Sequence, residues 1–380
     1  MIRFFAVIFT GLVFTTTVFA QSSPCEKQQC IAIVDAGSTG SRLHIYAYDL
    51  DVTKTPIHIK ELWNKKITPG FARIEANTNT IDSYLTILLA DSPIKKIPIY
   101  FYATAGMRLL PQMKQKKYYD ELSSWFKKHS EWQLVEAKTI TGNEEGLYDW
   151  LSVNYHLGNF ESPTNKSIGV MDMGGASVQI VFPIAETPTI NDKSQIQVNL
   201  YGRHYNLYVH SFLGLGQTEM SHQFLNSASC FVNNYPLPDG AEGQGNALSC
   251  EQEVSSLMNQ VHGVNQLIQP LLAANPVDSW YSIGGISNLA DSQFFNFQHS
   301  QLTNQDLLEQ ADSQICHQQW EDINNQYPDD DYVYQYCLFS AYYYALMVDG
   351  YGLYPEQTIN YLPPQQNIDW TTGVVLHQQR

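Results

Sequence analysis

Two short glycine-rich loops carry the residue types best suited to chemistry on phosphate groups. The first reads DAGSTGSR from Asp35, and the second reads DMGGASVQ from Asp172. Glycines let backbone N–H groups approach an anion, hydroxyls add donors, and an aspartate beside them can hold a cation that shields phosphate charge. Two such loops in one chain indicate two related halves that together grip a polyphosphate.

Each loop lies between two apolar runs that are typical of β-strands. Residues 31–34 and 168–171 precede the loops, and residues 43–50 and 178–184 follow them. Each leading aspartate therefore stands at a strand tip, and the unit differs from a Walker P-loop, which leads into a helix. For one loop alone the alternative is an ordinary Asp-Gly hairpin turn. The duplication favours the phosphate site.

The two loops resemble the first and fourth conserved regions of the nucleoside triphosphate diphosphohydrolases, the apyrase family within the actin, sugar-kinase and heat-shock-chaperone superfamily. Residues 103–108, 139–150 and 280–288 resemble the second, third and fifth regions, the last with departures from the commoner form. Residues 348–353, VDGYGL, are close to the VDGFGL of plant apyrases. The terminal motif at Trp370 matches only loosely, because Thr372 replaces a leucine.

The resemblance covers most of the mature chain and implies an α/β protein of two actin-like, ribonuclease-H-like lobes with a central active-site cleft. We place lobe I at residues 21–160 and lobe II at 161–380, because a turn-rich polar stretch lies between them. The C-terminal segment can pack back on lobe I. The implied activity is hydrolysis of ATP, ADP, GTP and GDP to the monophosphate, by a water that a glutamate activates and with a divalent cation.

The resemblance also implies a role for each loop residue. Asp35 and Asp172 are expected to hold Mg²⁺ or Ca²⁺ largely through its water shell. The expected phosphate-binding residues are Gly37, Ser38, Thr39, Gly40 and Ser41 in the first loop, and Gly174, Gly175, Ala176 and Ser177 in the second.

The base that activates water is expected in the third region, where Glu144 and Glu145 precede a helix-like run. Adjacent helical residues point about 100° apart, so one glutamate should face the cleft, and the resemblance selects Glu145. The resemblance also implies that Ser177 and Gln179, at alternate positions of one strand, help Glu145 to position the water. The alternative for Glu144 and Glu145 is that both are simply favoured by the dipole at a helix N-terminus. The alternative for Ser177 and Gln179 is an exposed face of a strand.

Three further residues are assigned around this centre. Thr104 follows a strand at residues 97–102 and is predicted to contact phosphate, the alternative being a threonine that satisfies a turn. Arg108 is predicted to be a buried ion-pair partner that braces its loop, although a guanidinium can also bind phosphate. Arg42 and Trp370 are assigned structural roles.

The nucleobase is predicted to lie between tyrosines. Residues 329–331 are aspartates suited to a helix N-terminus, and Tyr332 and Tyr336 then follow at the i, i+4 spacing of one helical face. Their rings could clamp a planar base, with Asn288 offering an edge hydrogen bond. Aromatic core packing is the alternative, and it is favoured for residues 342–344.

Composition bounds the compartment and the partners. The formal net charge of −16 over 380 residues argues against a nucleic-acid polymer or an anionic membrane as partner. Residues 1–20 are typical of a secretory signal peptide, with an uncleaved membrane anchor as the alternative. Six cysteines in an exported chain favour disulfides. They permit about 15 connectivities, among which we predict the pairing of sequence neighbours: Cys25–Cys30, Cys230–Cys250 and Cys316–Cys337. A secreted or periplasmic enzyme without a membrane span after cleavage is expected; the sequence sets no oligomeric state.

Two other functions remain open from the sequence. An exopolyphosphatase-like phosphohydrolase would share the loops and the glutamate but would need no base clamp. A non-catalytic nucleotide-binding protein would bind ATP without turning it over rapidly.

Overall fold

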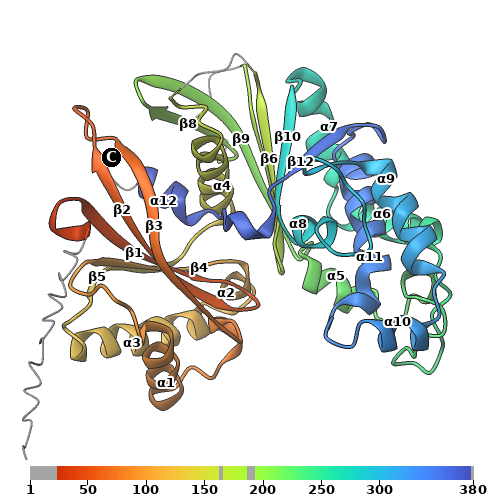
Figure 1. Ribbon diagram of the computed structural model, residues 1–380, viewed down its shortest axis with the longest axis horizontal. Helices are drawn as coiled ribbons and strands as arrows, with labels where there is room; N and C mark the ends of the chain where they lie inside the picture. The colour runs from red at the N-terminus through yellow and green to blue at the C-terminus, as the bar shows by residue number, and fades with distance from the viewer. Residues whose placement is uncertain (1–23, 162–165, 186–192, 378–380) are drawn as a thin grey trace, which may run out of the picture.

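The computed structural model describes residues 24–161, 166–185 and 193–377, which form two α/β lobes side by side (Figure 1). Lobe I, as observed, is a five-stranded sheet whose strands follow the order β3-β2-β1-β4-β5. These strands are β3 (Pro56–Ile67), β2 (Ser41–Leu50), β1 (Gln29–Ala36), β4 (Pro98–Ala103) and β5 (Gln133–Thr139). Strand β1 pairs antiparallel with β2 and parallel with β4.

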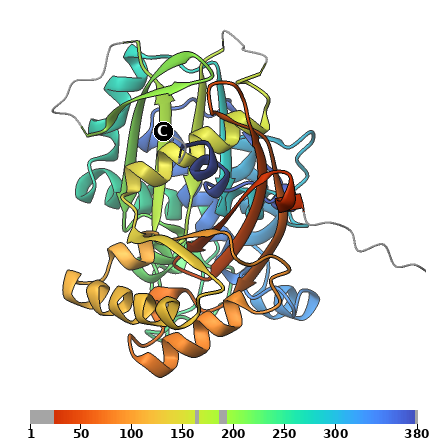
Figure 2. The same cartoon turned by 90° about the vertical axis from the view of Figure 1, so that its left-hand side faces the viewer.

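Two helices, α1 (Thr78–Leu89) and α3 (Gln112–Lys128), cover one face of this sheet, and a single turn, α2 (Ala105–Arg108), follows β4 (Figure 2). Helix α1 begins where the Asn77 side chain accepts a hydrogen bond from the Thr80 N–H at 2.9 Å. Helix α3 buries Tyr118, Leu122 and Trp125, which recur at helical spacing, and its lysines stay in solvent.

Lobe II, as observed, is a seven-stranded sheet in the order β11-β12-β10-β6-β7-β9-β8. Its strands are β11 (Gln301–Thr303), β12 (Thr358–Tyr361), β10 (Ser279–Gly284), β6 (Ile168–Met173), β7 (Ser177–Pro183), β9 (Arg203–Leu213) and β8 (Gln195–Leu200). Its helices are α5 (Gln217–Gln223), α6 (Ala247–Val261), α7 (Val264–Ala274), α8 (Gly285–Ala290), α9 (Asn304–Ala311), α10 (Trp320–Gln326) and α11 (Tyr336–Ala345). Except for α10, whose Ile323 belongs to a smaller cluster, these helices pack with the sheet into the largest hydrophobic core.

The two sheets repeat one local plan. In each, a central strand carries the leading aspartate of a glycine-rich loop one residue before the strand ends, and the chain returns as an antiparallel partner, β1 to β2 and β6 to β7. Each central strand also has a parallel neighbour, β4 or β10, whose carboxyl end lies beside the loop. Ligands of α/β sheets bind at the carboxyl ends of strands, so this plan turns both loops toward one site. The predicted strand, loop and strand units are confirmed.

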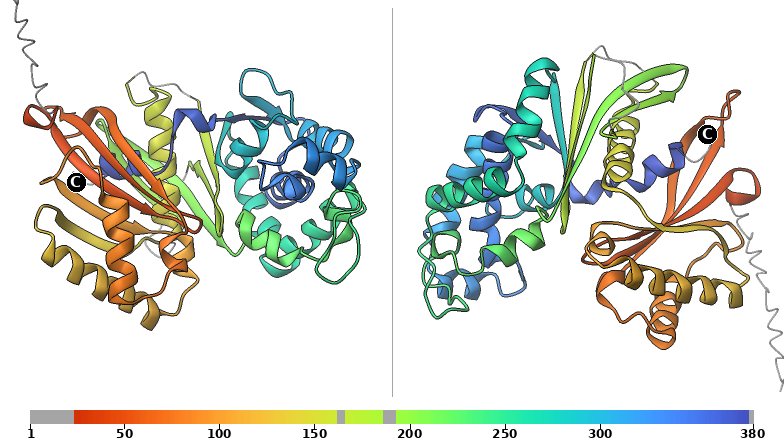
Figure 3. Two further views of the ribbon diagram at one scale, coloured as in Figure 1. Left: turned by 60° about the horizontal axis from the view of Figure 1, so that its bottom comes forward. Right: turned by 180° about the vertical axis from the view of Figure 1, so that it is seen from behind.

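Helices α4 (Gly142–His156) and α12 (Thr371–His377) lie between the sheets, side by side in both views of Figure 3. A third hydrophobic core forms there, with Ile33 from β1, Leu151 from α4, Val181 from β7 and Val374 from α12 among its buried members. Helix α4 is buried on nearly every side for this reason. The chain thus returns to lobe I at its C-terminal end, while a domain boundary at residue 160 stays a prediction.

Three disulfides join the sequence neighbours Cys25–Cys30, Cys230–Cys250 and Cys316–Cys337, so the predicted local pairing is confirmed. Within the described ranges, no helix combines the length and the apolar character needed to cross a membrane. The predicted signal peptide at residues 1–20 lies outside the described residues.

One helix begins later than predicted. Helix α11 starts at Tyr336, and the turn before it, Val333–Gln335, is a 3₁₀ helix, so Tyr332 precedes the α-helix. The Asp330 carboxylate accepts a hydrogen bond from the Tyr332 N–H at 3.0 Å, and this local turn competes with helix formation. The prediction that Tyr332 and Tyr336 lie one turn apart on the same face of an α-helix was therefore wrong. Core packing of Tyr342 and Tyr343, both fully buried, is confirmed.

Candidate active site

The two glycine-rich loops line one cavity of about 210 Å³ between the lobes. Lobe I contributes Asp35, Gly37, Ser38, Thr39, Thr104 and Ala105; lobe II contributes Asp172, Gly174, Gly175, Ala176, Ser177, Ile283 and Gly284. The intervening segments add Glu145, Asp149, Ile368, Asp369 and Trp370. Most of the residues predicted for phosphate, cation and water are thus brought together at the carboxyl ends of four strands.

The loops approach each other so closely that glycine is required at the contact. A Cβ atom at Gly175 would lie 2.5 Å from the Ser38 Oγ of the opposite loop. Backbone N–H groups on both sides are therefore accessible to a ligand between the lobes. Thr104, buried beside them, donates its N–H to the Ala36 carbonyl at 3.2 Å and begins α2.

Gly40 and Ser41 do not line this cavity, which corrects their predicted phosphate contacts. Ser41 is the first residue of β2 and is buried, and its Oγ accepts a hydrogen bond from the Tyr84 hydroxyl at 2.8 Å. A Cβ atom at Gly40 would lie 2.8 Å from the Ile67 carbonyl oxygen, so this glycine faces β3. Both residues belong to the hairpin packing that shapes the loop.

A capping box separates the two adjacent glutamates. The Glu144 carboxylate accepts the Thr141 N–H at 2.7 Å while the Glu144 N–H donates to the Thr141 hydroxyl at 3.1 Å. Glu145 instead faces the cavity and is buried, with its carboxylate accepting hydrogen bonds from Arg108 at 2.8 Å and from Gln179 at 3.1 Å. Of the two adjacent glutamates, only Glu145 lines the cavity, where a base would have to lie.

The side chains of Ser177 and Gln179 meet beside Glu145. The Gln179 amide donates to the Ser177 hydroxyl at 2.8 Å and to the Ser211 hydroxyl at 3.0 Å, and Arg108 donates to Ser177 at 2.9 Å. Ser177 and Gln179 are buried, so the exposed strand face considered for them is wrong. Arg108 is the ion-pair partner of Glu145, a contact that the sequence did not specify.

The carboxylates of the cavity strongly disfavour one another's charge. Burial, followed by the charge of Asp369, raises the pKa of Asp35 to about 7. Burial, followed by the charges of Glu145 and Asp35, raises the pKa of Asp172 to about 8. Burial also raises the pKa of Glu145, although Arg108 opposes this shift.

This donor set fits a divalent cation, which prefers carboxylate oxygens and would relieve their repulsion. Among the described residues, the Asp35 Oδ1 atom is buried without a hydrogen-bond partner. No three His, Cys, Asp or Glu side chains in ranges 24–161, 166–185 and 193–377 are grouped closely enough to chelate an ion.

Asp149 and Asp369 also line the cavity but were not predicted as site residues. Asp149 follows Glu145 by one helical turn, so the helical period could have revealed it. Asp369 carried no such signal, because its neighbours in space come from the other end of the chain.

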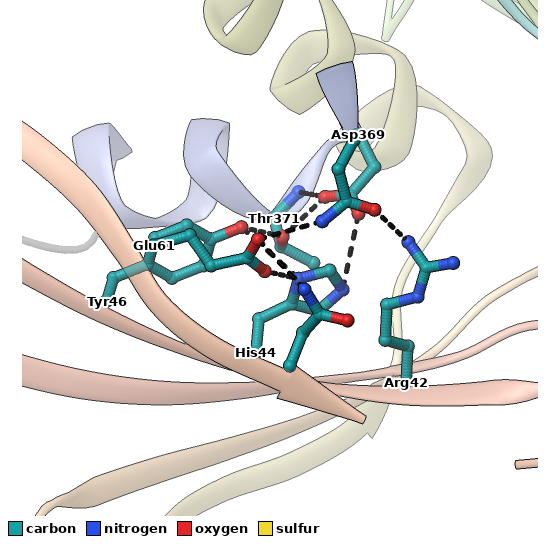
Figure 4. Close-up of polar contacts among 8 residues, drawn as sticks. Arg42, His44, Tyr46, Glu61, Asp369 and Thr371 are labelled. Atoms are coloured by element: carbon teal, nitrogen blue, oxygen red, sulfur yellow. Dashed lines mark hydrogen bonds and ion pairs between the residues drawn. The ribbon is translucent and has the colours of Figure 1, made fainter. Parts of the chain in front are cut away.

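Figure 4 shows how lobe I holds that C-terminal segment. His44, fully buried on β2, places its Nδ1 atom 2.7 Å from the Glu61 carboxylate and its Nε2 atom 3.2 Å from the Asp369 carboxylate. Arg42 donates to the Asn367 side-chain oxygen. The Glu61 and Asp369 carboxylates raise the pKa of His44 against the opposing effect of burial.

Trp370, next to Asp369, is buried and stacks between Tyr102 and Tyr148, with ring centroids 6.4 and 6.3 Å apart. The Tyr46 and Thr371 hydroxyls lie 2.6 Å apart beside it. The structure therefore places both Arg42 and Trp370 in the joint between lobe I and the C-terminal segment.

A second cavity, of about 450 Å³, adjoins the first and shares Thr39, Gly174, Gly175 and Gly284 with it. Its other lining residues include the predicted base-binding residues Asn288, Tyr332 and Tyr336, together with Lys66, Gln217 and Phe339. Tyr332 is 55 % exposed, whereas the half-buried Tyr336 donates its hydroxyl to Asp330 at 2.9 Å. Lys66 and Phe339 were missed, because only the tertiary fold brings them here.

Comparison with known proteins agrees with this architecture. A family model described as GDA1/CD39 (nucleoside phosphatase) matches residues 21–380. The ectonucleoside triphosphate diphosphohydrolase 1 of Bos taurus is 26 % identical over 418 aligned positions, covering 91 % of this chain and 80 % of the relative.

Two solved structures share the fold. A nucleoside triphosphate hydrolase from Neospora caninum superposes with a TM-score of 0.58 at 15 % identity, over 92 % of each chain. A Ppx/GppA family protein from Aquifex aeolicus superposes with a TM-score of 0.57 at 14 % identity, over 92 % of this chain and 97 % of its own. At these identities the likeness shows the fold, which confirms the predicted pair of actin-like lobes.

Proposed function

Because the chain belongs to the GDA1/CD39 (nucleoside phosphatase) family and is thereby an enzyme that hydrolyses nucleoside tri- and diphosphates, we propose how its residues perform that reaction. The observation that carries the proposal is the single cavity lined by both phosphate loops, into which Glu145 projects. The phosphate chain lies between the loops, and the base lies in the adjoining cavity. The terminal phosphate is then nearest to Glu145.

Glu145 acts as the general base that accepts a proton from the attacking water. Its hydrogen bonds to Arg108 and Gln179 fix the carboxylate, and Ser177, bonded to both of these side chains, supplies a further oxygen in contact range of a water. Water attacks the terminal phosphorus directly, and the nucleoside diphosphate or monophosphate leaves. No covalent phosphoenzyme forms in this scheme.

Asp35 and Asp172 are the residues that would hold Mg²⁺ or Ca²⁺ beside the phosphate chain. The cation, when bound, offsets the negative charge that gathers on the phosphate oxygens. Gly37, Ser38 and Thr39 on one side, and residues 174–177 on the other, contribute N–H groups and hydroxyls to the same oxygens.

The second cavity favours a nucleotide over a bare polyphosphate chain. Tyr332 and Tyr336 offer rings and Asn288 offers an amide at a place that continues directly from the phosphate loops. An exopolyphosphatase needs none of these groups. Purine and pyrimidine nucleotides should both be accepted, since stacking on aromatic rings tolerates any base.

We place the enzyme outside the cytoplasm, secreted or periplasmic. Three disulfides are typical of an oxidising compartment, and residues 1–20 are typical of a signal peptide. The chain carries a net charge of −16, so the nucleotide approaches with its own cation.

The deciding experiment measures phosphate release from ATP, ADP, GTP, AMP and tripolyphosphate, each with Mg²⁺, with Ca²⁺ and with excess chelator. We expect release from the tri- and diphosphates, little from AMP, and none in chelator. Equal rates on tripolyphosphate and ATP, with equal KM, would favour the exopolyphosphatase alternative. Undiminished activity in chelator would overturn the cation-assisted scheme.

A further inference from the structure

Asp149 has no assigned role in the reaction, yet it lines the catalytic cavity. It lies on α4, four residues after Glu145, so the two side chains occupy the same face of the helix one turn apart. Asp35 and Asp172 line the cavity from the two loops. Asp149 therefore approaches the expected cation from a third element.

Its burial is unusually complete for a carboxylate. Asp149 is 0 % exposed, and in the part of the chain that the structure describes neither of its oxygens has a hydrogen-bond partner. An ionised carboxylate without a partner is among the costliest groups to bury, and native proteins pair such groups or give them a metal. Among the described residues, the polypeptide therefore supplies no hydrogen-bond partner for this carboxyl group.

Two other acids that line the cavity, Glu145 and Asp369, do have a basic side chain as partner. Glu145 is paired with Arg108 at 2.8 Å, and Asp369 is paired with His44 at 3.2 Å. Asp35, Asp149 and Asp172 have no ion pair among the described residues.

We propose that Asp149 is a third carboxylate that holds the divalent cation of the active site, acting through the cation's water shell together with Asp35 and Asp172. The inference rests on the proposed cation site, and it adds a residue from the helix that also carries the base. Cation binding then fixes α4, and with it Glu145, relative to both loops.

A cation titration without nucleotide tests the proposal. Ca²⁺ binding is measured by calorimetry on the wild type, on Asp149→Asn, and on Asp120→Asn as a control that removes an exposed acid paired with Lys116. We expect Asp149→Asn to weaken Ca²⁺ binding by about 10- to 100-fold, the usual effect of losing an outer-sphere partner, and Asp120→Asn to leave it unchanged. Terbium luminescence excited through Trp370, which lines the cavity, gives a second reading.

Melting temperatures in chelator separate this role from a structural one. Because Asp149 has no polypeptide partner, Asp149→Asn should melt at the wild-type temperature or above it without cation, and should gain less from added Ca²⁺. A lower melting temperature in chelator, or unchanged Ca²⁺ affinity, would overturn the inference. The phosphate-release comparison of substrates tests the proposed function separately. In the Ca²⁺ titration, loss of affinity in Asp35→Asn with full affinity in Asp149→Asn would support a site of two aspartates and exclude Asp149.

Discussion

Glu144 and Glu145 are neighbours in sequence, but their carboxylates serve different structures. Glu144 completes the capping box of α4 and lies 3.2 Å from the Lys138 ammonium, whereas Glu145 bonds to Arg108 and Gln179 inside the cavity. The cap turns Glu144 outward, and the 100° step along the helix then turns Glu145 inward. One residue starts the helix and the next is placed to do chemistry.

Replacing each glutamate by glutamine should separate these roles. Glu145→Gln keeps the shape but cannot accept a proton, so kcat should fall by about 10² to 10⁴-fold with nucleotide affinity retained. Glu144→Gln should keep kcat, since glutamine also serves in a capping box, at a stability cost of about 1 kcal/mol or less. Steady-state kinetics, nucleotide binding and melting curves provide the comparison. An inactive Glu144→Gln beside an active Glu145→Gln would reverse the assignment.

At the scale of elements, the late start of α11 puts Tyr332 and Tyr336 in different environments. Tyr332 precedes the helix and is mostly exposed, while Tyr336 begins the helix, is half-buried and bonds to Asp330. Tyr332→Ala should therefore raise KM for ATP and ADP by about 5- to 150-fold, the equivalent of one stacking partner, and spare tripolyphosphate and the melting temperature.

Tyr336→Ala should raise the same KM values and also lower the melting temperature, because it removes packing and a hydrogen bond. Kinetics on nucleotide and tripolyphosphate are measured beside the melting curves of both variants. If Tyr332→Ala weakens both substrates equally, the base does not stack on it.

Helix α6 carries a carboxyl group that should make stability depend on pH. Burial is the largest cause that raises the pKa of Glu251 from 4.5 to about 8; the hydrogen bond that its protonated carboxyl group donates to Asp349, and the charge of Asp349, raise it further. The folded protein keeps a proton there that the unfolded chain releases, so this contribution is complete below about pH 4.5 and is lost as pH rises through 8. Glu251→Gln should flatten the decline in melting temperature between pH 5 and 8.5. An equally steep decline in the variant would show that another group is responsible.

Local sequence patterns were sufficient to predict the strands, both loops and the disulfide pairing, because alternation of apolar residues, glycine spacing and neighbouring cysteines are visible within a few residues. They failed where a side chain redirected the backbone, as Asp330 does before Tyr332. They also failed where partners are remote: His44 meets Asp369, and Lys66 reaches the second cavity, only through the tertiary fold. Asp149 lies between these cases, since its helical spacing from Glu145 was visible but its unpartnered burial was not.

At the scale of the whole molecule, we expect the third hydrophobic core to make the two lobes unfold as one cooperative unit. It combines side chains of both sheets with α4 and α12, so neither lobe can unfold without exposing part of it. Trp370 is central to this arrangement, because it is buried between Tyr102 of lobe I and Tyr148 of α4.

Trp370→Ala should destabilise the protein by about 3 to 5 kcal/mol, the usual cost of emptying a buried tryptophan site. Urea unfolding followed by circular dichroism should still show one transition, moved to lower denaturant. Trp370→Phe, which keeps an aromatic ring, should lose much less. A biphasic curve for the wild type would show instead that the lobes unfold independently.

The return of the chain to lobe I also sets an order of events during synthesis. Both glycine-rich loops emerge from the ribosome long before Asp369 and Trp370, which complete the wall of the cavity. A nascent or prematurely terminated chain can therefore form both hairpins yet leave the space between them open to water. If the proposed signal peptide directs the chain across a membrane before it folds, catalytic competence would arise only when export is nearly finished, and an incomplete chain would not hydrolyse nucleotides.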